Sequence, residues 1–270
     1  MILTLGTELI RWRNHRNLSQ LALANEANVS QRHISYIENG RSKPSREMLM
    51  RLCEAMFIPL RERNSLLALA GFSAAYQETG LDEPVMRPLL DALESMLQTH
   101  NPLPALAVDR FWNIVKQNSA SNIFFARLFD TEEIKLINRQ EGVVNLALLT
   151  MHPQGLRQYI KNWDEVYPLF VTRLSNEVNS SGDIEVRQKL ASYLKISELA
   201  TKDLVDLKTG LMPVVPLRLC VDGKELSLFS IISTVGTPQD ITADELRVEC
   251  FYPTDESTRD YFTCASFNAQ

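Results

Sequence analysis

The sequence predicts two domains: an all-α domain of five short helices, followed by a larger α+β domain with a small antiparallel sheet. With 270 residues, the chain exceeds a typical single domain, which holds roughly 100–200 residues. From Gly6 to Gly71 the apolar residues recur with a helical period, whereas strand-like alternation is concentrated toward the C-terminus. We therefore assign residues 1–72 to the first domain, 73–87 to a linker and 88–270 to the second domain.

Short breaks divide the first domain into helices expected at residues 6–16, 19–27, 31–38, 45–56 and 60–70. Ser19, Ser30 and Ser45 stand just before three of these helices, where a serine hydroxyl can accept from an unpaired N–H of the first turn. Pro44 and Pro59 also suit the starts of helices. Beyond them, Gly80 and two prolines mark the linker.

The second domain begins with a helix expected at about 88–98. Two short strands follow in PALAVD and FWNIVKQN, and a helix begins near Ser119. A helical middle extends to about residue 209. The last strands are expected in VVPLRLCVDG, KELSLFSIISTVG and DELRVECFYP, which together predict the antiparallel sheet.

Charge is distributed unevenly along the chain. The whole chain has a formal charge of −5, but residues 1–75 carry ten lysines and arginines against six acidic residues, a net of +4. The remainder therefore has a net charge of −9. A basic first domain beside an acidic second one suits a phosphate-facing module joined to a module that does not bind nucleic acid.

Several function classes are not expected. There is no cationic start followed by an apolar run and no long apolar stretch, so we expect a cytoplasmic protein without a membrane partner. No glycine-rich phosphate loop, G-x-S-x-G elbow or HExxH motif indicates an enzyme, and no metal or cofactor site is expected. The distant cysteines at positions 53, 220, 250 and 264 indicate free thiols, with a redox sensor as the alternative.

Residues 19–45 have the pattern of a helix-turn-helix. Apolar residues stand where two crossed helices would bury a shared face, and Asn28 stands in the turn, where a left-handed backbone is needed. The outward face of the third helix then presents amide, guanidinium, imidazole and phenol groups, which can read base edges: Gln31, Arg32, His33 and Tyr36. A solvated polar helix face is the alternative interpretation.

Two further groups could contact the sugar-phosphate backbone. Asn39, Arg41 and Lys43 follow the third helix in a loop that contains glycine, where cations and backbone amides can hold phosphates. Gln20, at the start of the second helix, could reach a phosphate or a base from the other side of the groove.

This segment resembles the xenobiotic response element (XRE) family of helix-turn-helix domains, which includes the lambdoid phage repressors. The resemblance covers about residues 5–71 and is carried by SQLALA and ISYIENGRSKP. It implies a lambda-repressor-like fold, double-stranded DNA as the partner and DNA contacts by the eight residues named above. It also implies that Arg13 and Glu38 form a structural pair between the first helix and the recognition helix.

The second domain resembles the MmyB-like ligand-binding domain, a PAS-like sheet with flanking helices. PALAVDRFWNIVKQNSASNIFF and LFSIISTVGTPQDITADELRVECFYPTDE carry the resemblance, which covers about residues 88–262. Some members of that family bind fatty acids or similar apolar molecules, which implies a small apolar effector. The family pattern includes an asparagine and a tryptophan that match Asn118 and Trp163.

Other candidate pocket residues come from strand alternation and the aromatic residues of the covering helices. They are Trp112, Ile114, Phe124, Phe125, Phe170, Leu228, Ser230, Ile232 and Phe251. Alternation points Phe229 away from Leu228 and Ser230. Two alternatives stay open: these side chains fill a solid core, or the domain is a protein-interaction and dimerisation module without a small-molecule ligand.

We also expect a homodimer on a palindromic operator. One short recognition helix reads only a few base pairs, and half-sites about one helical turn apart, roughly 34 Å, would place two such helices on one DNA face. An effector would then change DNA affinity through the linker.

Overall fold

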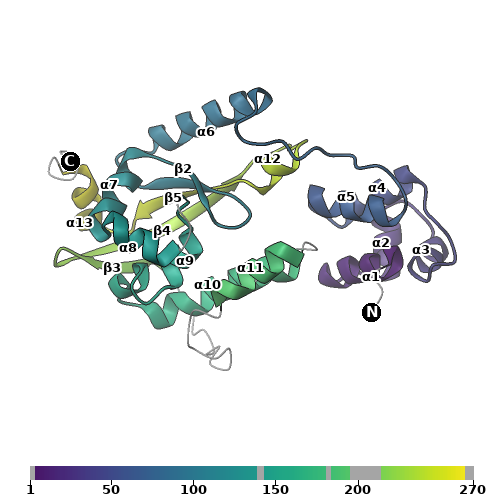
Figure 1. Cartoon of the computed structure of the whole chain (residues 1–270). Helices are drawn as coiled ribbons and strands as arrows, with labels where there is room; N and C mark the ends of the chain where they lie inside the picture. The colour runs from purple at the N-terminus through teal and green to yellow at the C-terminus, as the bar shows by residue number, and fades with distance from the viewer. Residues whose placement is uncertain (1–3, 139–142, 181–183, 195–213, 265–270) are drawn as a thin grey trace. The chain divides into compact units, whose positions relative to one another are not determined.

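The computed structural model describes residues 4–138, 143–180, 184–194 and 214–264. Figure 1 shows the elements along the chain. The chain divides into two compact units, which are described one at a time. The first unit contains the residues up to Thr79 and also the segment Thr237–Asp244; most of the remaining residues belong to the second.

Five helices form the body of the first unit: α1 (Leu5–His15), α2 (Gln20–Glu26), α3 (Gln31–Glu38), α4 (Arg46–Ala55) and α5 (Leu60–Leu69). The five predicted helices are therefore confirmed. The predicted serine caps are confirmed too, because the hydroxyls of Ser19, Ser30 and Ser45 each accept a backbone N–H from the first turn, at 3.0, 3.2 and 3.2 Å.

The turn between α2 and α3 has the predicted left-handed residue, since Asn28 has a φ of 52°. Leu23, Ala24, Ile34 and Ile37 are buried where the two helices share the core of this unit. Close packing also involves α1. A Cβ atom on Gly6 would lie 2.2 Å from the carbonyl oxygen of Glu38, so only glycine lets α1 approach the end of α3 this closely.

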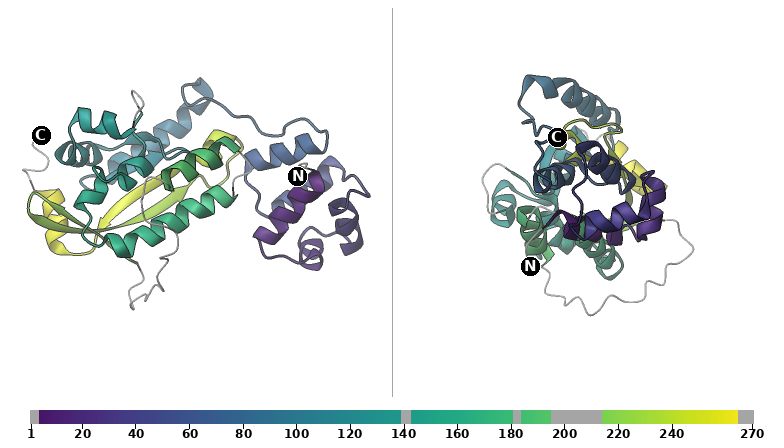
Figure 2. Two further views of the ribbon diagram at one scale, coloured as in Figure 1. Left: turned by 60° about the horizontal axis from the view of Figure 1, so that its bottom comes forward. Right: turned by 90° about the vertical axis from the view of Figure 1, so that its right-hand side faces the viewer.

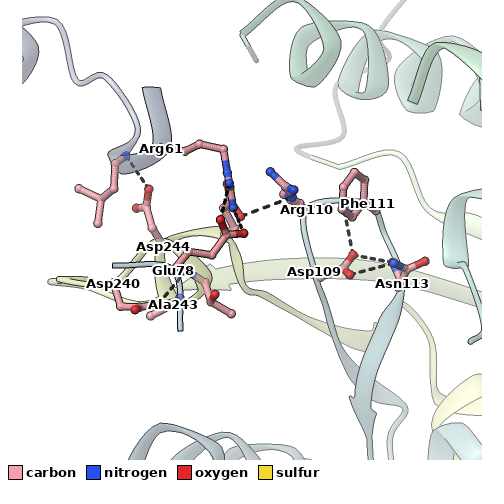
Figure 3. A network of polar contacts seen from close by, with 12 residues as sticks. Arg61, Glu78, Asp109, Arg110, Phe111, Asn113, Asp240, Ala243 and Asp244 are labelled. Atoms are coloured by element: carbon pink, nitrogen blue, oxygen red, sulfur yellow. Dashed lines mark hydrogen bonds and ion pairs between the residues drawn. The ribbon is translucent and has the colours of Figure 1, made fainter. Parts of the chain in front are cut away.

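The segment Thr237–Asp244 was not expected in this unit, because in sequence it lies inside the second domain. Pro59 precedes α5 but has no side chain that could cap it. The carboxylate of Asp244 accepts the N–H of Leu60 at 3.0 Å instead (Figure 3). Gln77 forms a parallel β-bridge with Asp240, whose carboxylate accepts the N–H of Thr79 at 3.1 Å. A distant stretch of chain thus completes this unit.

The second unit begins with the 3₁₀ turn η1 (Pro84–Met86) and α6 (Arg87–Thr99), followed by β1 (Ala105–Val108), β2 (Ile114–Gln117) and α7 (Ser119–Leu128). Its helical middle contains α8 (Thr131–Asn138), α9 (Leu146–Met151), η2 (Leu156–Tyr159), α10 (Trp163–Ser180) and α11 (Ile184–Leu194). Then come β3 (Leu217–Val221), β4 (Lys224–Thr234), β5 (Arg247–Pro253) and α13 (Glu256–Thr263); the short helix α12 (Ile241–Glu245), which lies between β4 and β5 in the chain, belongs mostly to the first unit. The predicted α+β composition is confirmed; the part of the expected helical middle from 195 to 209 lies outside the described residues.

The strands form one antiparallel sheet in the order β2-β1-β5-β4-β3. On one face, α6 packs against a cluster that includes Ala105, Ala107, Val248 and Cys250. The larger core lies on the other face, where α10 runs along β4 and β5 (Figure 2). Alternation along β4 and β5 therefore decides which side chains face this larger core. Among the described residues, no helix is both long and apolar enough to cross a membrane.

Candidate functional site

The recognition helix α3 has two distinct faces. Ile34 and Ile37 are buried against the other helices. Gln31 and Arg32 are exposed, and His33 and Tyr36 are half-buried. These four polar side chains belong to a single helix of eight residues, which is a length that enters a major groove.

Arg32 and Tyr36 are held together one turn apart on α3. The Nε of Arg32 donates to the Tyr36 hydroxyl at 2.8 Å, and the guanidinium carbon lies 5.2 Å from the centre of the Tyr36 ring. The bond uses Nε and not the two terminal nitrogens. Arg32 can therefore be oriented by Tyr36 while its terminal nitrogens point at acceptors such as the O6 and N7 of guanine.

The loop after α3 carries the predicted phosphate-facing residues. Gly40 has a φ of 68° and ends the helix. The Asn39 amide donates to the Ser35 carbonyl at 2.8 Å, so this side chain also closes the helix end. Arg41 and Lys43 are exposed in the loop that follows.

A buried network around Glu38 includes Gln20, another predicted DNA contact. Arg13 donates two bonds to the Glu38 carboxylate, from Nε at 2.6 Å and from Nη2 at 3.1 Å, so the predicted structural pair is present. The Gln20 amide nitrogen donates to the same carboxylate at 2.7 Å. In this structure Gln20 orients the network, and its contact with DNA stays a prediction.

A cavity of about 230 Å³ lies in the second unit, on the larger-core side of the sheet. Its walls come from the β1–β2 loop, α9, η2, α10 and strands β3, β4 and β5. Most lining side chains are apolar; the residues are Trp112, Leu146, Thr150, Leu156, Ile160, Val166, Leu169, Phe170, Arg173, Val215, Leu217, Leu228, Phe229, Ser230, Glu249 and Phe251.

Five predicted pocket residues line the cavity: Trp112, Phe170, Leu228, Ser230 and Phe251. Strand pairing explains why they meet, because Ser230 on β4 lies opposite Phe251 on β5. Phe229 also borders the cavity, although its ring stacks on Tyr252, which packs with the α6 side of the sheet.

Asn118, Phe124 and Phe125 do not line this cavity. Asn118 is fully buried, and its side chain caps α7 by accepting the N–H of Ser121 at 2.9 Å. It also bonds to three other backbone groups, so its hydrogen-bonding capacity is used structurally. Phe124 packs on Phe125 and Phe262, with ring centres 6.3 and 5.6 Å apart, in the solid part of the core.

Trp163, Ile114 and Ile232 also lie away from the cavity lining. Trp163 begins α10, where Tyr167 and the Arg157 guanidinium pack on its ring. Ile114 is on β2, the strand at the far edge of the sheet from β4. Ile232 shares the face of Leu228, but its side chain lies further along β4 and is 39% exposed.

The sequence did not indicate the two charged residues that line the cavity, Arg173 and Glu249. The Arg173 guanidinium carbon lies 4.2 Å from the centre of the Trp112 ring, and Phe170 meets the same ring edge-on at 5.2 Å. Glu249 alternates with Phe251 along β5, and Arg173 follows Phe170 by one helical turn on α10. These two periodicities could have identified both residues once Phe170 and Phe251 were chosen.

None of the four cysteines is in a disulfide bond. Burial raises the pKa of Cys53 to about 12 and also raises that of Cys250, so these thiols stay protonated at neutral pH and are poor redox sensors. Within the described ranges, no group of three or more histidine, cysteine, aspartate or glutamate side chains is placed to hold a metal ion.

Two family models match separate parts of the chain. Residues 89–263 match the family model of the MmyB-like transcription regulator ligand binding domain, and residues 9–63 match a helix-turn-helix family model. No curated protein matches the chain. A solved structure described as an RNA-binding light-oxygen-voltage receptor aligns with 98% of this chain at 10% identity and a TM-score of 0.25, and the chain spans 64% of that structure's length.

Proposed function

Because the chain belongs to the MmyB-like transcription regulator ligand binding domain family, we propose that it binds a specific DNA site and that a small apolar effector controls this binding. The helix-turn-helix makes it a transcription regulator. The effector, the operator and the dimer described below belong to the proposal.

The outward face of α3 is the observation that supports the DNA-binding part of this proposal. Gln31 and Arg32 are exposed there beside Tyr36, and the exposed cations Arg41 and Lys43 follow in the next loop. Base readers and phosphate-binding cations thus lie on adjacent parts of one unit, as sequence-specific major-groove binding requires. A selection from random duplex DNA should enrich one motif, and affinity for it should fall steeply with salt because phosphate contacts release counterions. Enrichment of no motif would contradict the proposal.

The cavity in the second unit is the observation that supports the effector-binding part of this proposal. At about 230 Å³ it lies below the roughly 300–1,000 Å³ of pockets for drug-sized ligands, so it suits a small or medium-chain molecule. Its mostly apolar wall favours an alkyl chain, and the family resemblance adds fatty acids as the candidate class. A protein-interaction module would need no such cavity.

Denaturing extraction and mass spectrometry of the purified protein should find a stoichiometric lipid-like species. Medium-chain ligands titrated against operator-bound protein should change DNA affinity by about 5–150-fold, the usual range of allosteric coupling. If no such ligand binds or shifts affinity, the interaction-module alternative takes its place.

We propose further that the regulator acts as a homodimer. Two copies of α3 on a palindrome would double the length of DNA that is read, and the half-sites should lie about one helical turn apart. Footprinting on the selected motif measures that spacing.

A further inference from the structure

A larger cavity lies in the second unit, apart from the apolar one. Its volume is about 630 Å³, within the roughly 300–1,000 Å³ of pockets that hold small organic ligands. Its walls come from α8, α9, α11 and the residue before β2. Leu146 and Thr150 line the apolar cavity, whereas Asn145 and Leu148 line the larger one, so the α9 segment separates the two. None of the described residues lines both.

Buried polar side chains form one wall of this larger cavity, which we call the polar cavity. Asn138, Asn145 and Tyr193 are 5%, 3% and 3% exposed. The Asn145 amide nitrogen lies 2.9 Å from the side-chain oxygen of Asn113 and 3.1 Å from the Tyr193 hydroxyl. The side-chain oxygen of Asn138 accepts the Asn145 backbone N–H at 2.6 Å. Asn145 thus holds the other three side chains in fixed positions before any ligand enters.

This wall has hydrogen-bond donors to spare. The side-chain amides of Asn113 and Asn138 each donate one bond, to a carboxylate and to a backbone carbonyl respectively, both at 2.8 Å. An amide has two N–H groups, so each keeps one for a ligand. Burial raises the pKa of Tyr193 to about 12, so its hydroxyl stays protonated. The Phe111 carbonyl that could accept this proton is 3.4 Å away, longer than a good hydrogen bond, so the hydroxyl can turn to a ligand.

The polar cavity is lined by a lysine and by no acid among the described residues. Lys189 is half-buried, with its Nζ 4.5 Å from the centre of the Phe111 ring, and within the described ranges it has no carboxylate partner. The carboxylate of Asp109 lies close by, but it already accepts the backbone N–H groups of Phe111 and Asn113 and the Asn113 amide. A cation with several neutral donors favours a ligand that is an anion and rich in acceptors.

We propose that the polar cavity is a second ligand site, which binds a small organic acid with one carboxylate. Lys189 would pair with the carboxylate, and the three spare donors would bind further oxygens of the ligand. One cation balances one negative charge, so a phosphate ester with nearly two charges fits less well. Ile137 and Leu148 also line the cavity and suit a ring or a short hydrocarbon. This site is additional to the apolar effector site, because the two ligands would occupy separate cavities.

Three pairs of probes test the preference for a carboxylate. The acids are 4-hydroxybenzoate, 4-hydroxyphenylacetate and 3-(4-hydroxyphenyl)propionate, which place the carboxylate at three distances from the ring. The primary amide of each has nearly the same shape but no charge. Calorimetric titration of the full-length protein should show at least one acid binding about tenfold to a hundredfold more tightly than its amide, the range expected for a hydrogen bond to a charged group.

The substitution Lys189→Met removes the cation and keeps an unbranched side chain beside the Phe111 ring. It should lower the affinity for the acid about tenfold or more and leave that for the amide unchanged. The matched control is Lys224→Met, because Lys224 also lies over an aromatic ring, 5.6 Å from the centre of Tyr261, and lines neither cavity. It should leave both affinities unchanged.

The outcomes separate this site from the apolar one. Leu228→Arg, which places a charge in the apolar cavity, should leave the acid bound; if it abolishes binding of the acid, the acid occupies the apolar cavity and the inference is wrong. Equal losses in Lys189→Met and Lys224→Met would overturn the inference too. If octanoate binds and none of the three acids does, the polar cavity is not such a site and the proposed function stands. If an acid binds as expected and octanoate does not, the proposed apolar effector fails and this site stands.

Discussion

Replacing Arg13 with alanine tests how much of the first unit's stability depends on the network around Glu38. The side chain of Arg13 is 14% exposed and that of Glu38 is 3% exposed. After Arg13→Ala, the Glu38 carboxylate would stay buried and would still accept from the Gln20 amide. Breaking a buried ion pair by removing one partner costs about 3–5 kcal/mol, because an uncompensated charge stays buried. That is a large part of the about 5–15 kcal/mol by which domains are usually stable.

Hydrogen exchange followed by mass spectrometry is the suitable assay, because it reports on the two units separately. Peptides from α1, α2 and α3 should open more easily by about 3–5 kcal/mol, while peptides from the sheet should be unchanged. The matched control is the double variant Arg13→Met with Glu38→Leu, which removes both charges and should recover most of the loss. A single variant that exchanges like the unaltered protein, or a double variant no better than the single one, would refute this reasoning.

Four other predictions follow from the same structure. Arg32→Ala should lower the binding free energy for the selected DNA site by about 1–3 kcal/mol and relax the base preference. Lys43→Ala should weaken binding to all DNA sequences alike and reduce the salt dependence of the affinity by about one unit of slope. Equal effects of the two substitutions on sequence specificity would contradict the assigned roles. Asp244→Ala should lower the free energy of opening of α5 by about 1 kcal/mol, because the Asp244 carboxylate accepts the first N–H of that helix. Hydrogen exchange measures this free energy, and unchanged exchange would exclude the cap. Leu228→Arg should abolish effector binding, because it places an unpaired charge in the cavity, and it should leave DNA binding unchanged. Phe229→Leu should weaken effector binding less, because the Phe229 ring stacks on the other side of the sheet. Equal losses of effector affinity in calorimetry would contradict this prediction. Light scattering should show a dimer on the operator, and a strict monomer both free and bound would exclude it.

The five helices of the first unit could be predicted almost completely because their signals are local. A serine cap acts within three residues, and Asn28 adopts its left-handed backbone within a single turn. The outward position of Arg32 follows from the helical period alone. Even the pair of Arg13 and Glu38 lies inside one compact helical pattern that the family resemblance covers.

The cavity could be predicted only in part, because its wall combines residues that are far apart in sequence. Strand alternation selected Leu228 and Ser230, which line the cavity. The same reasoning also selected Ile232, which lies too far along β4 to line it. Asn118 matched a family position. Only the packing of α7 against β1 shows that its side-chain oxygen accepts the N–H groups of Ser121, where it caps α7, and of Ala105.

The sequence by itself determined the elements: five helices, three of them with serine caps, the polar face of α3, and strands that alternate toward a core. The tertiary structure alone decided which distant groups meet. It places Asp244 at the start of α5 and brings Arg173 of α10 within 3.7 Å of Glu249 on β5. Helical and strand periodicities repeat within a few residues and are therefore visible in the sequence. The position of a charge in a cavity depends on how helices pack against a sheet, and no local sequence pattern contains that information.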